Sequence, residues 1–475
     1  MAKVMAHTAE RAEPSSGSWI LLVVSVVVVT VLAISVPHLV GAEGWLAGGR
    51  AGEKFLYVAL VAYLGASFLY AASVAVRQSN LAAGAVALTR GGFLLHTTAI
   101  VVRWASGGHA PLASIYEMVL MFAWGVVALH EVAEWKFKLP FLGAITIPIA
   151  ALSLILMQVL PGEIRPLVPA LQSTWLQIHV TLAMLSYAGL TISFAVSLLY
   201  LIKDGLAARN FLSWVSALVL GVYATVVGTS VTGSMALTMP AWDAAAREKV
   251  LVAPHQALMV PIQALGWPFM IVLALAAATL ALNLVGTYSP AGEHWENLAR
   301  RTFLATLFAQ ALAFALLMIK VTSGPYFVPQ YGQNFGVHLA TSPFLLAGIV
   351  TALFASLAWE LLLWKYDAIV AYLPSRDALD GFIYKSVAIS FPLLTLMIIA
   401  GAYWANRTWG SYWSWDPKED WALITWLTYA GYLHMRLTRG WRGRRSAYFA
   451  IIGFAIVMFT FFGVTYLLPG LHAYA

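Results

Sequence analysis

The chain contains no cysteine and few charged residues, and both absences restrict what it can be. Without cysteine it forms no disulfide and offers no thiolate as nucleophile or metal ligand, which leaves its 11 histidines as the strongest soft-metal ligands. Only 10% of the 475 residues are charged and 61% are hydrophobic, with a mean hydropathy of +0.81. This is too little polar surface for a soluble globule, so the composition predicts an all-α, polytopic membrane protein.

Apolar runs long enough to cross a hydrocarbon core of roughly 30 Å recur about 13 times along the chain. They lie at residues 19–41, 55–76, 82–104, 114–134, 141–160, 174–202, 212–236, 263–288, 303–323, 343–364, 385–405, 419–437 and 447–469. The first run follows a mixed-charge tail without a small-residue cleavage site. We therefore expect a retained anchor and not a signal peptide.

Basic residues predict which ends of these spans face the cytoplasm. With the N-terminus inside, the positive-inside rule is met at nearly every turn; the inside loops then hold Arg77, Lys136, Lys138, Lys203, Arg209, Arg300, Arg301, Lys365, Arg436, Arg439, Arg442, Arg444 and Arg445. The net charge of +7 therefore serves topology and does not indicate binding of nucleic acid. The loops at 105–113, 161–173, 237–262, 324–342 and 406–418 face outward, as does the C-terminus.

One outward loop runs into the twelfth span as WGSYWSWDPKEDWALITW, residues 409–426. Asp416, Pro417 and Glu419 are typical of a helix start: a side-chain acceptor at the N-cap, a residue without N–H at N1, and a carboxylate at N3 that reaches back. We expect Asp416 and Glu419 to act mainly as caps. An interfacial aromatic belt would account for two or three of the rings.

The density of indole rings exceeds what such a belt needs. Five tryptophans fall within 18 positions, and a glycine at Gly410 allows close approach of the backbone; the five are Trp404, Trp409, Trp413, Trp415 and Trp421. A platform of indoles suits a large, flat, apolar ring held at the membrane surface, because stacking and edge contacts are the main attractions available. Heme is the obvious candidate.

Three histidines lie where a heme iron could be bound by imidazole. His179 opens the sixth span at its outer end, and His472 follows the last span, so both lie at the level of the tryptophans. His434 follows Asp416 by 18 residues, about 27 Å along one helix, which places it near the cytoplasmic side. The alternative for any one of them is a purely structural role, in which the histidine caps a helix or forms a hydrogen bond with a neighbouring backbone group.

At this point the sequence resembles a known family. The stretch from Trp409 to Trp426, followed by YLHMR, is similar to the tryptophan-rich WWD signature of heme-handling proteins in cytochrome c maturation, and the remainder resembles the CcsA/ResC branch of System II. Supporting stretches are RWASGGHAPLASIYEMVLMFAW at 103–124, LQSTWLQIHVTLAMLSYAGL at 171–190 and FFGVTYLLPGLHAYA at 461–475.

The resemblance implies a bacterial cytoplasmic-membrane protein that carries heme b outward and presents it for thioether attachment to apocytochrome c. It implies axial ligation of an outer heme by His179 and His472, against a segment that includes Trp409, Trp413, Trp415, Asp416 and Trp421, and an inner site at His434. Implied partners are a ResB/CcsB-type subunit, thioredoxin-like thiol reductants and membrane lipid. That subunit would supply the second inner imidazole; within this chain, His96 is the best candidate, although a histidine bonded to a neighbouring helix is equally compatible.

The resemblance also divides the chain into four parts. Residues 1–81 form N-terminal anchor helices, 82–204 the first part of the heme-handling core, 205–378 inserted helices, and 379–475 the WWD motif and the rest of the core. The inserted part contains His255 and His338 in outer loops. Two departures are the stretch Ala113-Ser114-Ile115-Tyr116-Glu117, where the family usually shows asparagine in an SN-YE element, and the missing fused partner domain. Arg90 and Arg103 are expected to snorkel to the two interfaces, and Glu117 to be buried beside a partner that the sequence does not name.

Three other readings stay open. A System I protein of CcmF or CcmC type would share the WWD segment, although the short interval from His434 to His472 favours System II. A heme-free transporter explains the spans but not the three histidines. A quinol-oxidising, cytochrome b-like carrier predicts histidine pairs that face each other within spans, and only His96 and His434 approach that pattern.

Overall fold

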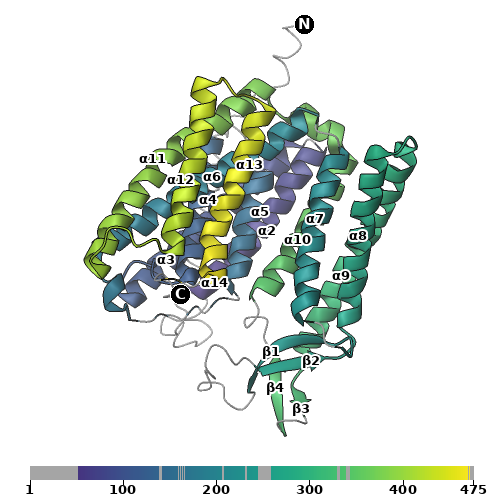
Figure 1. Cartoon of the computed structure of the whole chain (residues 1–475), viewed down its shortest axis with the longest axis horizontal. Coiled ribbons are helices and arrows are strands. Elements are labelled where there is room, and N and C mark those ends of the chain that lie inside the picture. The colour runs from purple at the N-terminus through teal and green to yellow at the C-terminus, as the bar shows by residue number, and fades with distance from the viewer. Residues whose placement is uncertain are drawn as a thin grey trace.

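The computed structural model describes residues 52–76, 78–137, 142–158, 160, 162, 164, 166–205, 208–230, 233–243, 258–328, 332–337, 343–468 and 470. The predicted span 19–41 and the candidate histidines His255, His338 and His472 lie outside these residues. Within them the protein is a bundle of long helices with a small sheet at one end (Figure 1).

The helices coincide with the predicted spans from the second onward. They are α2 (Glu53–Val76), α3 (Ser79–Gly107), α4 (Ile115–Phe137), α5 (Gly143–Gln158), α6 (Thr174–Lys203), α7 (Ala208–Ser230), α8 (Gly266–Tyr288), α9 (Gly292–Thr322), α10 (Pro343–Tyr372), α11 (Arg376–Trp409), α12 (Pro417–Thr438), α13 (Arg444–Met458) and α14 (Val464–Leu467). In the described part, nine helices are long and apolar enough to cross a membrane, or ten if the bent α10 is one span. The helical membrane protein is confirmed, while the count of thirteen spans and the side of each terminus stay predictions.

The helix α6 lies at the centre of the larger of two hydrophobic cores. Its apolar window is 78% buried, against at most 61% in the other span candidates. It packs against α4, α11 and α13, while α2 and α3 pack together on the outside. The second core joins α7, α8, α9 and α10, all inside the predicted inserted part 205–378. Burial on nearly every side explains why α6 is apolar all round and not along one stripe.

The second core also carries a four-stranded antiparallel sheet, which the prediction of an all-α fold missed. The strands are β1 (Leu237–Asp243), β2 (Leu258–Ile262), β3 (Tyr326–Val328) and β4 (Gln333–Val337), in the order β2-β1-β4-β3. Leu237 and Met239 are buried, as are Val260 and Ile262, so alternate side chains cover the helix ends. Prolines inside β1 and β2 concealed this short alternation in the sequence.

Two ion pairs join α3 to α4, and they correct the expectation that both arginines snorkel to the interfaces. Arg103 Nε lies 2.8 Å from Glu117 Oε1, with both side chains at most 3% exposed, and Arg90 Nε lies 3.1 Å from Glu131 Oε2. The two glutamates are 14 residues apart, about four helical turns, so they lie on one face of α4. Each arginine therefore pairs with a carboxylate on the neighbouring helix; Arg103 is buried there, while the side chain of Arg90 stays 25% exposed.

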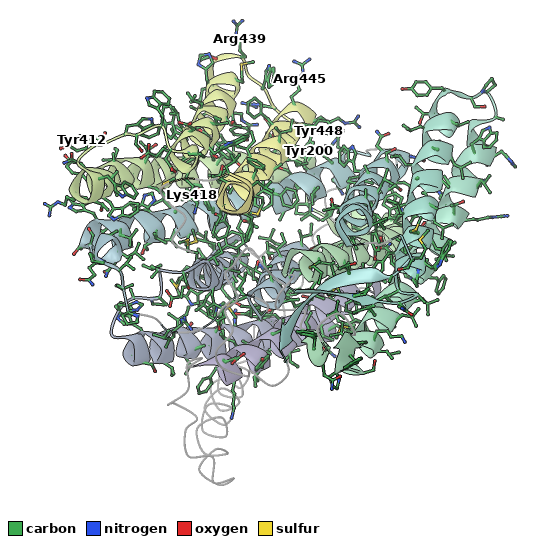
Figure 2. The ribbon with its side chains drawn as sticks, turned by 60° about the horizontal axis from the view of Figure 1, so that its bottom comes forward. Tyr200, Tyr412, Lys418, Arg439, Arg445 and Tyr448 are labelled. Carbon is green, nitrogen blue, oxygen red and sulfur yellow. The ribbon has the colours of Figure 1, made fainter. Side chains whose placement is uncertain are left out.

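Two further acidic residues, Asp204 and Asp380, form ion pairs at the end of the bundle where α6 and α12 end. Asp204 follows α6 and forms ion pairs with Arg376 of α11, at 2.7 Å, and with Arg444 of α13. Asp380 lies 2.7 Å from Arg436 of α12. Figure 2 shows Arg439 and Arg445 near the α12–α13 turn, far from Tyr412 at the other end of these helices. The basic residues thus gather at one end, as the charge pattern predicted.

We expect Asp204→Asn to lower the free energy of unfolding in detergent by about 1–2 kcal/mol, because both arginines are half exposed and the pair is only partly desolvated. Burial raises the pKa of Asp204, but hydrogen bonds from Arg376 and Arg444 and their charges outweigh it, so the pKa is lowered. A lowered pKa gives stability that is present above about pH 4 and is lost as the pH falls through the folded-state pKa.

Thermal unfolding at neutral and acid pH checks this expectation. The difference between the native protein and Asp204→Asn should shrink at acid pH, where the carboxyl is protonated. The exposed Asp367 of α10 provides a control, since Asp367→Asn should change little at either pH. A difference that is constant with pH would show that the charge of Asp204 is not what stabilises this end.

Candidate functional site

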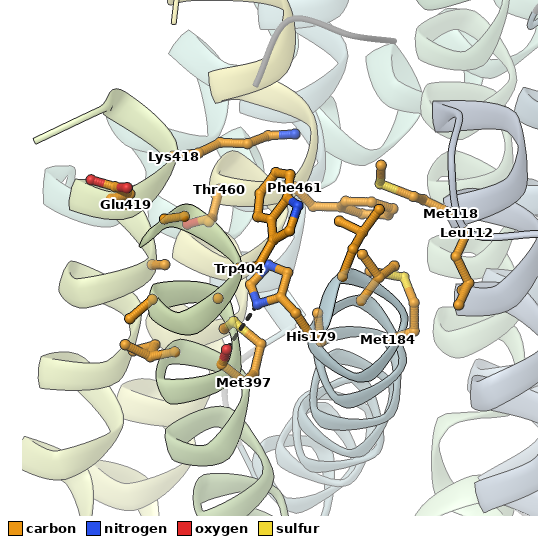
Figure 3. Close-up of a pocket in the computed structure, with 18 of the residues that line it drawn as sticks. Leu112, Met118, His179, Met184, Met397, Trp404, Lys418, Glu419, Thr460 and Phe461 are labelled. Atoms are coloured by element: carbon orange, nitrogen blue, oxygen red, sulfur yellow. Dashed lines mark hydrogen bonds between the residues drawn. The ribbon is translucent and has the colours of Figure 1, made fainter. Parts of the chain in front are cut away.

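A cavity opens at the other end of the bundle, where α6, α11 and α12 meet. Its volume is about 1080 Å³ when the space open to the outside is included. Its walls are mostly apolar, with the methionines Met118, Met184 and Met397 among them (Figure 3). Thioether side chains are soft and adaptable, and they suit a large apolar ligand.

His179 lies in the wall of this cavity, on the second turn of α6. Its Nδ1 lies 2.8 Å from the carbonyl oxygen of Met397 on α11, a bond drawn in Figure 3. Because a carbonyl only accepts, Nδ1 carries the proton and the lone pair is on Nε2. This is the arrangement found at metal-binding histidines, where a bond at one ring nitrogen fixes the tautomer and the ring orientation.

The ring of His179 fits against α11 because residue 401 is glycine. A Cβ at Gly401 would lie 2.6 Å from Nδ1 and 2.7 Å from Cε1 of the imidazole, closer than such atoms can approach. Trp404, one turn further along α11, stacks on His179 with ring centroids 6.2 Å apart and planes 20° apart. The indole N–H of Trp404 donates to the carbonyl of Ala170 at 2.9 Å and holds the ring in place.

The WWD segment does not form one flat platform of indoles. Trp413 lines the cavity, whereas Trp415 is 71% exposed with a φ of 58°, and their rings are nearly perpendicular at 86°. Trp409 packs on the edge of Trp404, and Trp421 packs on Phe459, 4.3 Å between centroids. Of the five tryptophans expected to form the platform, the structure therefore places Trp404 and Trp413 in the cavity wall and the other three outside its lining.

The predicted caps of α12 are confirmed. The side chain of Asp416 accepts from the Lys418 N–H at 3.0 Å, and Glu419 Oε2 accepts from the N–H groups of Ser414, at 2.7 Å, and Asp416, at 3.3 Å. Gly410 has a φ of 77° and ends α11 as a left-handed cap, so its role is this turn and not the close approach expected from the sequence. Together these groups make the sharp corner between α11 and α12 that forms one side of the cavity.

A π-helical segment, Phe459–Gly463, supplies another wall. Thr460 is held by Thr425 at 2.9 Å and donates to the carbonyl of Trp421 at 3.2 Å. This turns Phe461 into the cavity, where its ring meets Phe122 and Tyr187 at centroid distances of 5.7 and 6.0 Å. Single π-helical turns recur at functional sites because the extra residue redirects the side chains.

The two other described histidines with expected roles lie outside the cavity. His434 is exposed on α12 near the basic end, where its carbonyl accepts from Thr438 at 2.6 Å. His96 is fully buried, with Nδ1 3.4 Å from the Tyr63 hydroxyl of α2. Within the described residues, no three His, Asp or Glu side chains gather as a metal site. Of the expected ligands that the structure describes, His179, His434 and His96, only His179 lies in the cavity.

Comparison with known proteins decides the family. The sequence model of a family described as cytochrome C assembly protein matches residues 112–472. The chain belongs to this family. Its relatives among cytochrome c assembly proteins include the cytochrome c biogenesis protein CcsA of Picosynechococcus, 32% identical over 80% of this chain and 84% of that protein, and that of Synechocystis, 31% identical over 83% and 87%.

These relatives confirm the resemblance to CcsA-type assembly proteins. The cytochrome c biogenesis protein CcsA of Trichormus variabilis is 30% identical over 441 residues, which cover 92% of this chain and 99% of that protein. Most of the segment 205–378 therefore has a counterpart in that assembly protein and is not peculiar to this chain. Gly401 and Lys418 are cavity residues that the sequence did not single out, because a lone glycine or lysine at a span end carries no signal of its own.

Proposed function

We propose that this protein acts in cytochrome c biogenesis by holding heme b at the outer end of its bundle for attachment to apocytochrome c. The observation that carries the proposal is His179, whose proton is fixed on Nδ1 by the Met397 carbonyl while the ring lines an apolar cavity. An imidazole in this tautomer binds iron through Nε2, and the apolar walls favour a porphyrin over water. The membership in the cytochrome c assembly family and the helices long and apolar enough to span a membrane support this role.

His472 is the proposed second axial ligand. It lies two residues beyond Gly470, which packs on the α12 cap so closely that a Cβ would come within 2.4 Å of Asp416 Oδ2. Two residues of extended chain span at most about 7 Å. The end of the last span therefore brings the chain to the WWD corner, and this supports a His179–His472 pair around one porphyrin.

The inner site is proposed at His434, where heme enters from the cytoplasm. This imidazole is exposed on α12 among basic side chains, so a second ligand would come from outside the described residues, and we propose a ResB/CcsB-type membrane subunit. His96 is a weaker candidate because it is enclosed between α2 and α3. An exposed His434 and an enclosed His96 do not form the facing pair that a cytochrome b-like carrier needs.

The chemistry at the outer site is addition of two thiols to two vinyl groups. Each apocytochrome S–H adds across a C=C bond, so sulfur bonds to one carbon, hydrogen to the other, and no electrons are lost. This chain contributes no thiol; it positions the ring, excludes water and keeps the iron ligated. The two apocytochrome thiols must be reduced before they react. We propose that thioredoxin-like reductants keep them reduced.

An absorption spectrum of the purified protein and of His434→Ala tests the proposal. The native protein from a heme-replete host should show low-spin heme, and His434→Ala should lose most of it from both sites, because the outer site is filled from the inner one. Pyridine hemochrome assay gives the heme content per chain. Native protein without heme would favour a heme-free transporter, and normal heme content in His434→Ala would contradict the inward-to-outward route.

A further inference from the structure

Lys418 is the only cation among the described residues that line the large cavity. It is the second residue of α12, and in Figure 3 its side chain runs across the upper edge of the cavity. The surrounding wall is apolar, formed by residues such as Phe461, Ala422 and Ile398. An ammonium group in such a place is costly to desolvate unless a negative group comes to it.

Two carboxylates neighbour this ammonium, and Asp416 attracts it electrostatically without forming an ion pair with it. Glu419 Oε2 is engaged by the N–H groups of Ser414 and Asp416. Asp416 accepts from the Lys418 backbone N–H, and it lines a second, small cavity together with Lys418 and Gly470. Among the described residues, the Nζ of Lys418 makes no hydrogen bond or ion pair. The molecule that fills the large cavity can therefore bring the group that pairs directly with this ammonium.

The hydrogen bonds that cap α12 indicate which donor on this wall can receive a negative group of the bound molecule. The N-terminal N–H groups of α12 are already satisfied by Asp416 and Glu419, so the helix end itself has no donor to offer. Among the α12 residues that line the cavity, Lys418, Glu419 and Ala422, the remaining donor is the flexible side chain of Lys418. His179 lies in the same cavity on α6. The cavity thus offers an imidazole for a metal and an ammonium for an anion, within otherwise apolar walls.

We infer that Lys418 pairs with a propionate carboxylate of bound heme and so determines which edge of the porphyrin faces α12. This rests on the proposed function, because it takes heme as the ligand whose iron His179 binds. Heme carries its two carboxylates on one edge and its vinyl groups away from that edge. Anchoring the propionate edge at α12 directs the vinyl groups away from Lys418, toward the side where apocytochrome thiols must approach.

Titration of the heme-stripped full-length protein with two porphyrins separates this role from a structural one. The probes are iron protoporphyrin and its dimethyl ester, which lacks the carboxylate charges. Binding at the outer site is the spectral change that His179→Gly removes. The native protein should bind heme about 10- to 100-fold more tightly than the ester, the range expected for one charge-assisted hydrogen bond. In Lys418→Met the two porphyrins should bind about equally tightly, because heme binds more weakly than before while binding of the ester is unchanged.

Two further variants complete the test. Lys418→Arg should keep the preference for heme, because guanidinium also pairs with carboxylate. Lys136 is an exposed lysine in the last turn of α4. Lys136→Met should therefore bind both porphyrins as the native protein does. If Lys418→Met weakens heme and ester equally, or weakens neither, the propionate role is overturned while heme binding stands. If no binding depends on His179 with either porphyrin, the proposed function itself fails.

Discussion

His179→Gly is expected to abolish attachment of heme to apocytochrome c, and millimolar imidazole supplied from outside should restore part of it. The substitution removes an axial ligand and leaves a space in the cavity wall that free imidazole can enter. The fold should persist, because the other groups that form the wall, Trp404 and the α12 cap, make their own hydrogen bonds. The measurement is heme-stained cytochrome c in a host that depends on this protein. His472→Gly should behave in the same way.

A matched control is available at the same end of the bundle. His109 bonds the adjacent Ala110 carbonyl at 3.1 Å and does not line the cavity. His109→Gly should leave cytochrome c assembly unchanged, with or without imidazole. Full assembly in His179→Gly without imidazole would refute the ligand assignment. A loss that imidazole cannot repair, in a variant that elutes and unfolds as native, would assign His179 to something other than iron ligation.

Gly401→Ala is expected to reduce assembly by about 10- to 100-fold, the usual cost of losing the group that orients a metal ligand. The new methyl group would lie 2.6 Å from His179 Nδ1, so the imidazole must leave the Met397 carbonyl. Imidazole should not rescue this variant, because the displaced side chain still fills the space. In His179→Gly/Gly401→Ala the obstruction is gone, and imidazole should work as it does in His179→Gly.

The control for Gly401→Ala is on the same helix. Gly381 also lies in α11, and a Cβ there would meet nothing within 4 Å. Both substitutions raise helix propensity by up to about 1 kcal/mol, so neither should destabilise α11 by itself. Gly381→Ala should assemble cytochrome c normally. Equal activity of the two alanine variants would show that the imidazole does not need the position seen against α11.

Several features of this protein could be predicted from the sequence because they depend on local or averaged properties. Composition alone indicates a helical membrane protein, since burial in lipid needs only a sufficient length of apolar residues. The cap formed by Asp416 and Glu419 is readable because its partners are at most five residues apart. Counting helical rise from that cap places His434 at the end opposite the WWD corner, and the exposed end of α12 agrees.

Other features depend on contacts between segments that are distant in the sequence. His179 and the Met397 carbonyl are 218 residues apart, and Gly401 becomes important only because α11 packs along α6. Whether Arg103 reaches water or Glu117 depends on the rotation of α3 against α4. The tertiary structure also decided that Trp413 enters the cavity and Trp415 does not, through a backbone turn between them.

The sequence by itself therefore determined the class of protein, the opposite ends at which His179 and His434 lie, and the caps of α12. Each of these follows from residue type and from spacing along one chain segment. Only the tertiary structure decided the cavity, the tautomer of His179 and the place of Lys418 in the cavity wall. These depend on which faces of α6, α11 and α12 meet, and helices that are apolar nearly all round do not reveal that choice in their pattern.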